Sequence, residues 1–332
     1  MWKKNVLVTA VSGDVGNSIL KCLQPEVAPE VGHLYGCDMY PYPCGMNKVE
    51  RCFQVPPCKE EEPYLHALLD IAETCHIDVI VPSNEQEIAA LSRRRNVIEA
   101  QGIRLFLHDA AVYDVFFDKK KTQGLLQSLG LPFLPTWRAA EYQEQGTFPL
   151  VLKDAFSCGS KSLRIAHDEA ELARWLDRKG DQIIQRCVGT PDSEYTVPVF
   201  SGDGGRHVVA LPLRRILSKA GYTSFIELAR PEYQEKIFAI CTKIAAHIKL
   251  HGSIDLQMRE ENGVFYVFEC NPRLSGTVNF RRQLGFEDAR WWLQSLSQED
   301  LTIPFQLPEQ SFVGIRELNE EIVWRNEHDD TV

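Results

Sequence analysis

Hydrophobic and polar positions in the first third of the chain alternate between short apolar runs and longer amphipathic segments. The apolar runs predict β-strands, and the amphipathic segments predict α-helices between them. Strand–helix alternation of this kind is typical of a small open parallel sheet, which binds ligands at the carboxyl ends of its strands. We therefore expect a Rossmann-like α/β domain over residues 1–110. The expected strands are 6–10, 33–37, 78–81 and 104–107, and the expected helices are 17–23, 62–75 and 85–101, the last with Ser83 as its N-cap.

The pattern changes after residue 118, where strands are no longer followed regularly by helices. A helix at 120–129 and a proline-containing connection at 130–135 lead into a small lobe, and a longer run of strands follows, covered by one long helix. This favours an α+β region of two lobes, 111–190 and 191–305, followed by an acidic tail at 306–332. The expected strands are 149–153, 163–166, 182–187, 194–200, 207–213, 253–259 and 264–269, and the further helices are 169–175 and 232–249.

The last two predicted strands carry oxygen ligands. Glu269 and Asn271 are two residues apart, so in a strand their side chains point the same way. A three-residue loop at 261–263 would pair Asp255 opposite Glu269 and place Gln257 on the same face. Carboxylate and amide oxygens in such a group suit magnesium carrying nucleotide phosphates. The alternative is that Glu269 and Asn271 only end a strand and begin the turn that follows.

Composition narrows the classes of function. The chain has 332 residues and a net charge of −10, which argues against nonspecific binding to nucleic acid. No run of about eighteen apolar residues is present, so we expect no membrane partner, and no secretory signal is apparent. Ten cysteines are scattered without close pairs and read as reduced thiols, which predicts a cytoplasmic protein.

Several cationic and small residues precede the predicted hairpin in a specific order. Asp118-Lys119 opens a helix, Lys153 ends an apolar strand, and a polar loop of small residues follows at 157–162. This succession resembles the ATP-grasp superfamily, most closely its carbamoyl-phosphate-synthase-like ligases, and the resemblance covers residues 1–305. The chain departs from the family in having Asp154 where a proline usually follows the lysine, and in having one glycine, Gly159, in the loop.

The resemblance implies a two-lobed ATP-grasp fold, with the loop as a lid that closes over ATP. It implies ATP and magnesium as cofactors, with manganese as an alternative to magnesium. Arg273 and Lys153 are the expected catalytic residues, and Glu85, Arg214 and Arg273 are the candidates for contact with substrate. The implied metal ligands are Gln257, Glu269 and Asn271. The implied nucleotide contacts are Lys119, Lys153, Ser157, Gly159, Ser160, Lys161, Gln185, Cys187, Val188, Glu194 and Gln257. Among them, the resemblance implies that the segment 185–188 is a hinge that contacts adenine and that Glu194 holds the ribose.

The chemistry that fits these residues is the activation of a carboxylate as an acyl phosphate, followed by attack of an amine. The predicted partners are thus a small carboxylate and a small amine, and a homodimer is left open. One alternative is an NAD-dependent oxidoreductase or epimerase using Gly13, Gly16 and Asp38, although the three-glycine fingerprint is incomplete because position 11 is valine. Another is a nucleotide-binding protein without turnover.

Overall fold

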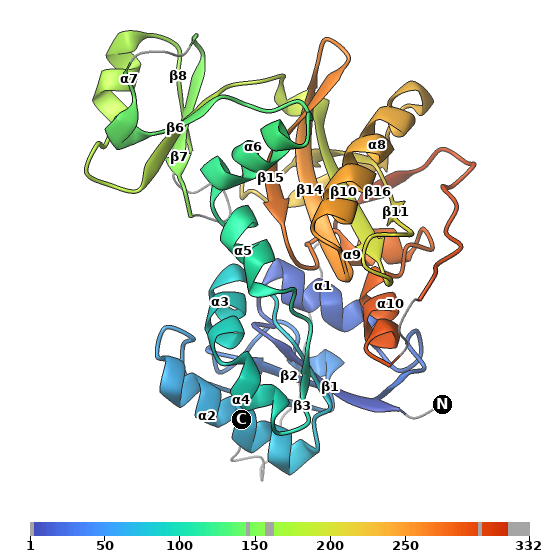
Figure 1. The fold of residues 1–332 in the computed structure, drawn as a ribbon. Coiled ribbons are helices and arrows are strands. Elements are labelled where there is room, and N and C mark those ends of the chain that lie inside the picture. The colour runs from blue at the N-terminus through green and yellow to red at the C-terminus, as the bar shows by residue number, and fades with distance from the viewer. Residues whose placement is uncertain (1–2, 144–146, 157–162, 298–300, 318–332) are drawn as a thin grey trace.

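Three sheets organise the chain, which the computed structural model describes over residues 3–143, 147–156, 163–297 and 301–317 (Figure 1). The first is a parallel sheet in the order β3-β2-β1-β4-β5. It confirms the predicted Rossmann-like domain and adds β3, whose sequence shows no apolar run. The strands are β1 Lys4–Thr9, β2 Val31–Asp38, β3 Arg51–Gln54, β4 Val79–Val81 and β5 Arg104–Leu105.

Helices connect these strands, as the sequence pattern predicts, with two corrections. The single helix expected at 85–101 is wrong: the backbone leaves helical geometry at Arg94, which separates α3 from α4. Asn84 caps α3 by accepting a hydrogen bond from the Glu87 N–H at 3.0 Å, so the expected cap Ser83 is also wrong. The helices of this part are α1 Asp14–Cys22, α2 Glu61–Cys75, α3 Glu85–Arg93, α4 Arg95–Glu99 and the short η1 Met46–Lys48.

The second sheet forms a lid lobe (residues 136–186) that projects from the rest of the molecule at the upper left of Figure 1. Its four antiparallel strands run in the order β6-β9-β7-β8, and α7 covers them around a small core of their own. The elements are β6 Thr136–Arg138, η2 Ala139–Glu141, β7 Leu150–Asp154, β8 Arg164–Ala166, α7 Glu169–Trp175 and β9 Gln182–Arg186.

The lid lobe is smaller than the sequence predicts, because residues 111–131 do not belong to it. Helices α5 Ala110–Phe116 and α6 Lys119–Ser128 bury Val112, Phe116 and Leu126 in the core of the C-terminal lobe. Gln123 on α6 also donates a hydrogen bond to the Val267 carbonyl of β15 at 2.8 Å. Apolar burial therefore fixes Lys119 to the C-terminal lobe, while Lys153 belongs to the lid lobe.

The third sheet builds the C-terminal lobe, in the order β15-β14-β10-β12-β13-β16 with β11 paired to β10. The strand expected at 207–213 is wrong, since this segment divides between β11 and β12. The tail boundary at residue 306 comes too early, because β16 pairs with β13. The elements are η3 Pro191–Ser193, β10 Glu194–Ser201, β11 Val209–Ala210, β12 Leu213–Leu217, β13 Thr223–Leu228, α8 Pro231–His247, β14 Gly252–Glu261, β15 Val264–Asn271, α9 Val278–Arg282, α10 Asp288–Ser295 and β16 Val313–Ile315.

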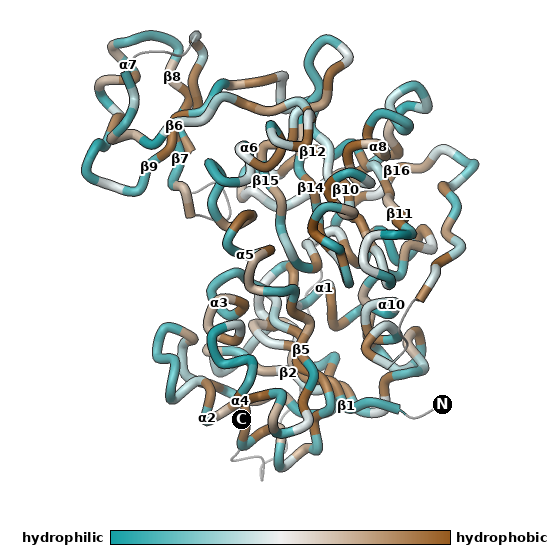
Figure 2. Tube along the Cα trace, viewed as in Figure 1, coloured by the Kyte–Doolittle hydropathy of each residue, from teal (hydrophilic) through white to brown (hydrophobic). Residues whose placement is uncertain are grey.

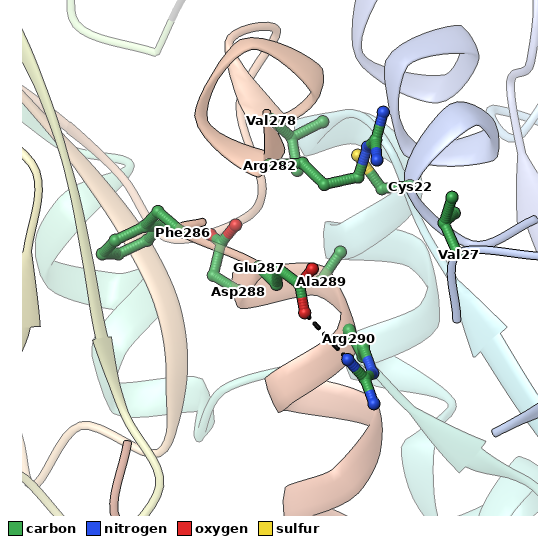
Figure 3. A pocket seen from close by; sticks show the side chains of 9 residues that line it. All are labelled: Cys22, Val27, Val278, Arg282, Phe286, Glu287, Asp288, Ala289 and Arg290. Carbon is green, nitrogen blue, oxygen red and sulfur yellow. Dashed lines mark hydrogen bonds and ion pairs between the residues drawn. The ribbon is translucent and has the colours of Figure 1, made fainter. Parts of the chain in front are cut away.

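The N-terminal domain and the C-terminal lobe share one hydrophobic core. Apolar residues of β1 and α1, such as Val6 and Ile19, pack in the same cluster as Val278 and Trp292 of the C-terminal lobe, and apolar segments line this junction in Figure 2. Side chains of α1, α9 and α10 line a narrow recess at this junction (Figure 3). The two parts are therefore held in a fixed relation, which positions the end of β15 against the N-terminal domain.

None of the helices in the described part of the chain combines the length and apolar character needed to cross a membrane.

Candidate functional site

The hairpin of β14 and β15 holds the predicted oxygen ligands, but its register differs from the predicted one. Asn262 and Gly263 both have positive φ, at 53° and 77°, and form a two-residue turn of the kind that Asn-Gly favours. The pairing then shifts next to Gln257, leaving Phe268 as an extra residue in β15. The turn and the bulge together place Gln257 opposite Glu269 and Asp255 opposite Asn271, so the predicted Asp255–Glu269 pair is wrong.

Asp255 is buried beside these residues and does not line the cavity next to Glu269. Its side chain is fully buried, and the Thr196 hydroxyl donates to its two oxygens at 2.8 and 3.0 Å. Burial raises the pKa of this carboxyl. Glu269, by contrast, keeps 23% of its side chain exposed and lines a cavity together with Asn271. The metal prediction therefore rests on Glu269 and the two amides, Gln257 and Asn271.

Two lysines from different lobes approach Glu269. Lys119 Nζ lies 3.8 Å from Glu269 Oε1. Lys119 and Lys153, the second lysine, are both largely buried. Burial lowers the pKa of Lys153 to about 8; Glu269 opposes this effect and Lys119 adds to it. Buried cations next to one carboxylate leave positive charge that phosphate oxygens can satisfy. The structure thus brings together Lys119, Lys153 and Glu269, as the sequence predicts.

Arg138 adds a link between the lobes that sequence reasoning missed. It reaches from β6 to Asp118 at 2.5 Å, and Asp118 also caps α6 by accepting the Lys120 N–H at 2.9 Å. The same guanidinium pairs with Asp181 at 2.5 Å. This ion-pair chain orients the lid lobe against the helix that carries Lys119. The loop residues Ser157, Gly159, Ser160 and Lys161 lie outside the described residues, and their nucleotide role stays a prediction.

The predicted hinge residues are ordered by hydrogen bonds at the edge of the lid lobe. The Gln185 amide donates to the Thr136 hydroxyl at 2.9 Å. The Cys187 N–H donates to the Pro149 carbonyl at 3.1 Å, which extends the backbone ladder beyond the end of β9. The Val188 carbonyl accepts from Arg259 at 3.4 Å. These contacts fix the segment that joins the lid lobe to the C-terminal lobe, and the adenine contacts remain predictions.

Glu194, the predicted ribose contact, is buried between two arginines. Arg215 donates to one of its oxygens through Nε and Nη2, at 3.0 and 2.8 Å, and Arg259 donates to the other at 2.9 Å. Arg215 and Glu194 therefore lie on the same face of the sheet as Thr196. The ribose contact remains a prediction, and it would have to share a carboxylate that two guanidinium groups already bind.

Arg214 does not join this group. It pairs in register with Tyr195, so its side chain lies on the opposite face of the sheet from Arg215. There it contacts Glu227 and donates to the Asp192 carbonyl at 3.2 Å. Placing Arg214 with the other substrate residues was therefore wrong, because adjacent strand residues face opposite ways.

Arg273 and Glu85 meet where the N-terminal domain contacts the C-terminal lobe. Arg273 donates to Glu85 Oε1 through Nε at 2.9 Å and also through Nη2, which lies 3.4 Å from Asn271 Oδ1 as well. Burial acts to lower the pKa of Arg273, but Glu85, Asp255 and Glu269 together raise it. The guanidinium is therefore a permanent cation at the edge of the metal residues, as the sequence predicts.

A cavity of about 260 Å³ opens beside Glu85, Lys119 and Glu269. Sequence reasoning missed its aromatic wall, although the Phe116-Phe117 pair directly before Asp118 is the signal that could have revealed it. In the described part of the chain, no cluster of three His, Cys, Asp or Glu residues suited to a metal is present, so Glu269 would act with amide oxygens. The cavity is lined by Glu85, Gln86, Ala89, Phe116, Phe117, Lys119, Phe156, Glu269, Cys270 and Asn271.

The glycine-containing loop of the N-terminal domain is arranged differently from a dinucleotide site. Asp38, the acid expected to bind a ribose, accepts hydrogen bonds from the Ser12 N–H at 2.8 Å and the Tyr40 N–H at 3.0 Å. Gly16 allows α1 to approach the strand, since a Cβ there would lie 2.4 Å from the Ala10 carbonyl oxygen. The turn therefore accounts for Asp38, and the close packing of α1 accounts for Gly16.

Comparison with known proteins identifies two regions of the chain. Residues 6–106 match a family model described as the PylC-like N-terminal domain. Residues 189–319 match a model described as ATP-grasp in the biosynthetic pathway with Ter operon.

Known relatives are similar over a little more than half of the chain. The carbamoyl phosphate synthase large chain of Clostridium botulinum (strain Eklund 17B / Type B) is 26% identical over 204 residues, which are 56% of this chain and 19% of that protein. The C-terminal section of the same enzyme's large chain from Aquifex aeolicus is 23% identical over 210 residues, 58% of this chain and 39% of that protein. The chain therefore spans well under half the length of these relatives.

Solved structures share the fold over most of the chain. N5-carboxyaminoimidazole ribonucleotide synthetase from Thermus thermophilus has a TM-score of 0.73 at 16% identity, covering 95% of this chain and 84% of that one. The biotin carboxylase domain of the Hydrogenobacter thermophilus 2-oxoglutarate carboxylase, in complex with MgADP and bicarbonate, has a TM-score of 0.70 at 15% identity, covering 92% and 72%. The chain therefore has an N-terminal parallel-sheet domain followed by an ATP-grasp fold, and these two regions are similar to the PylC-like N-terminal domain and to the ATP-grasp family respectively.

Proposed function

We propose that the protein is an ATP-dependent carboxylate–amine ligase that works through an acyl phosphate. The observation that carries the proposal is the convergence of Lys119 and Lys153, from two lobes, on Glu269 beside Asn271 and Arg273. Carbamoyl phosphate synthase and N5-carboxyaminoimidazole ribonucleotide synthetase, to which the chain is similar, carry names that specify a carbamoyl and a carboxyamino product, and they support the same class.

The donor set fits magnesium that takes most of its ligands from phosphates and water. Glu269 would hold it with Asn271 and Gln257, and magnesium when bound would neutralise charge on the phosphates of ATP. The MgADP bound in the related biotin carboxylase domain supports this choice of ion. Manganese shares the preference for oxygen ligands and is tested as a replacement in the same assay.

In the proposed reaction, an oxygen of the substrate carboxylate bonds to the γ-phosphorus while the bond from that phosphorus to the bridging oxygen breaks, releasing ADP. An amine then attacks the carbonyl carbon, phosphate leaves, and the amine nitrogen loses a proton. Lys119 and Lys153 stabilise charge on the phosphates. Arg273 orients the carboxylate by giving it the hydrogen bonds that it otherwise donates to Glu85. No side chain has to act as a nucleophile, because positioning and electrostatics suffice.

The test is product analysis with purified protein, ATP, magnesium and pairs of carboxylates and amines. We expect ADP and phosphate to form only when a suitable carboxylate is present. Release of AMP and pyrophosphate would overturn the acyl-phosphate mechanism. Thermal protection by ATP without product from any pair would favour a nucleotide-binding protein that does not turn over.

The oxidoreductase alternative has its own test. Asp38 is already engaged by two backbone N–H groups, so we expect NADH to bind weakly or not at all. A fluorescence titration that revealed tight NADH binding would revive this alternative.

Sedimentation of the purified chain with and without ATP would decide whether a homodimer forms.

A further inference from the structure

We infer that the face of the C-terminal sheet under the start of α8 carries a second small-molecule site, which binds an uncharged polyhydroxylated ligand such as a sugar. A cavity of about 400 Å³ opens there, which is the size of a small-molecule site. It shares no lining residue with the cavity beside Glu269. The side chains that carry the inference are Tyr195, Arg214, Glu227, Arg230, Tyr233 and Glu260.

The cavity lies on the opposite face of the sheet from the predicted nucleotide residues. α8 covers this face, where Val197 of β10 belongs to the same core as the apolar residues of the helix. Tyr195 is two residues from Val197 and points the same way, whereas Glu194 points to the other face. Tyr195 pairs with Arg214, and Arg214 pairs with Glu227, so these three side chains form a row across β10, β12 and β13.

Tyr195 lines this cavity with a hydroxyl group that no protein group satisfies. The residue is only 4% exposed, and its ring packs edge-on against Tyr233 and Phe265, at centroid distances of 6.4 and 5.3 Å. Among the described residues, the hydroxyl groups of Tyr195 and Tyr233 have no hydrogen-bond partner. Burial raises the pKa of Tyr195 to about 12, so the hydroxyl keeps its proton. A buried hydroxyl of this kind is expected to find its partner in a bound molecule.

The charges at the cavity disfavour a simple ion. Arg214 pairs with Glu227, so these two charges already match. Arg230 and Glu260 carry opposite charges and both act on the buried tyrosine hydroxyl, while Asp192 adds a carboxylate at the exposed edge. An anion would meet Glu260, and a cation would meet Arg230. Either ion would therefore bring like charges together in a partly desolvated cavity.

Hydroxyl groups on neighbouring carbon atoms match this arrangement. A guanidinium group only donates hydrogen bonds, a carboxylate only accepts them, and a phenol does both. A polyol hydroxyl also does both, so adjacent hydroxyl groups can accept from Arg230, donate to Glu260 and contact Tyr195 between them. An uncharged ligand also leaves the ion pair of Arg214 and Glu227 intact.

This second site lies back to back with the carboxylate that is predicted to hold the ribose of ATP. Three of its lining residues, on β10, β12 and β14, are each adjacent in sequence to a member of the ion-pair group Glu194, Arg215 and Arg259. A ligand that fixes the three side chains on one face therefore also fixes the strands that carry this group on the other. We expect binding on the two faces to be coupled, and the coupling to be reciprocal.

The first experiment identifies the class of ligand by binding, without turnover. The full chain is mixed with magnesium and a saturating non-hydrolysable ATP analogue, so that the nucleotide site is filled. Saturation-transfer NMR then measures D-glucose, D-galactose, D-mannose, D-ribose and myo-inositol. We expect saturable binding of at least one polyol, which neither inorganic phosphate nor methylammonium displaces. Failure of all five polyols to bind, or displacement by either ion, would overturn the proposed class.

Two variants locate the site. Tyr195→Phe removes only the hydroxyl group, and Arg230→Gln removes the exposed guanidinium, so each should weaken polyol binding about tenfold. Tyr40→Phe is the matched control, since it removes the hydroxyl of a tyrosine that is 57% exposed in the N-terminal domain. Wild-type affinity in both Tyr195→Phe and Arg230→Gln would overturn the location. If Tyr195→Phe fails to fold, the exposed Arg230 still decides it.

Calorimetry of the ATP analogue tests the coupling between the two faces. Saturating polyol should change the affinity for the analogue at least about fivefold, and the analogue should change the affinity for the polyol by the same factor. In Tyr195→Phe the analogue should bind as in the wild type, with the effect of the polyol reduced. An unchanged affinity in the wild type would overturn the coupling. None of these results depends on ligase turnover, so they stand or fall separately from the proposed function.

Discussion

β2 and β15 both carry an acid near the carboxyl end of the strand, yet the two acids make different contacts. Asp38 at the end of β2 accepts two backbone hydrogen bonds, at 2.8 and 3.0 Å, and so holds a turn. Glu269 near the end of β15 has Lys119 at 3.8 Å as its nearest ion-pair partner within the described residues. The sequence around an acid thus indicates that a site is possible, and the state of its oxygens indicates whether they are available to a ligand.

The largest effect should come from neutralising Glu269, whose carboxylate is available to a ligand. Glu269→Gln keeps the size of the side chain and removes the charge that a magnesium ligand needs, so we expect kcat/KM for ATP to fall at least about a hundredfold. The melting temperature should change little, because Glu269 is a partly exposed edge residue. Asp38→Asn is the matched variant and should keep turnover. Wild-type activity of Glu269→Gln at low magnesium would contradict the metal assignment.

A smaller effect, with a characteristic pH dependence, is expected at Lys153. Burial lowers its pKa to about 8, so the side chain is mostly charged at pH 7 and mostly neutral above pH 9. Phosphates favour the charged form, so affinity for ATP should fall as the pH rises from 7 to 9.5, and ATP binding near pH 8 should take up a proton. Calorimetry in buffers of different ionisation enthalpy measures both quantities.

Lys153→Arg and Lys153→Met separate charge from position. Arginine stays charged throughout this range, so its ATP affinity should be nearly independent of pH. Methionine removes the charge and should weaken ATP binding about tenfold or more at pH 7. A pH dependence that persists unchanged in Lys153→Arg would mean that another group titrates.

Local patterns predicted most of the elements, but the connections between distant segments lay beyond them. Alternation of apolar and polar residues correctly gave the five-stranded domain apart from β3, whose short sequence Arg-Cys-Phe-Gln has no clear period. The pattern did not predict α5, and the helix expected at 120–129, which is α6, was assigned to the lid lobe because a sequence does not show which core an amphipathic helix will join. The packing of Phe116 and Leu126 against the C-terminal lobe decides that question.

In the candidate site, too, local residue patterns were predictable and contacts between distant segments were not. The residue types and order of Lys119, Lys153 and Glu269 predicted that these side chains lie together, and the structure confirms this, while their phosphate and metal roles stay predictions. The register was not predicted, because a two-residue Asn-Gly turn and a bulge at Phe268 shift it together. Partners distant in sequence, such as Glu85 for Arg273, depend on the shared core that fixes one domain against the other.

Removing the carboxylate of Asp38, which two backbone N–H groups bind, should lower stability and leave turnover unchanged. Asp38→Ala leaves the Ser12 and Tyr40 N–H groups without their acceptor, so we expect the free energy of unfolding to fall by about 1–3 kcal/mol. Activity per folded molecule should remain. Urea denaturation, with ATP turnover measured in the absence of urea, checks both expectations, and a loss of turnover without a loss of stability would give Asp38 a role in the site.

The smallest effect concerns a third acid, Glu87 in α3, which is buried and accepts hydrogen bonds from Thr9 and Tyr64 at 2.5 and 2.9 Å. Burial raises its pKa from 4.5 to about 7, although the two hydroxyl groups oppose the shift. Between those pH values the folded chain holds a proton that the unfolded chain has released. The free energy of unfolding should therefore decrease as the pH rises from about 4.5 to 7. Glu87→Gln cannot titrate, so its stability should fall less steeply over this range, with turnover retained. Urea unfolding at pH 5, 6, 7 and 8 measures the difference in slope, and identical slopes in the two proteins would show that Glu87 is already ionised at pH 5.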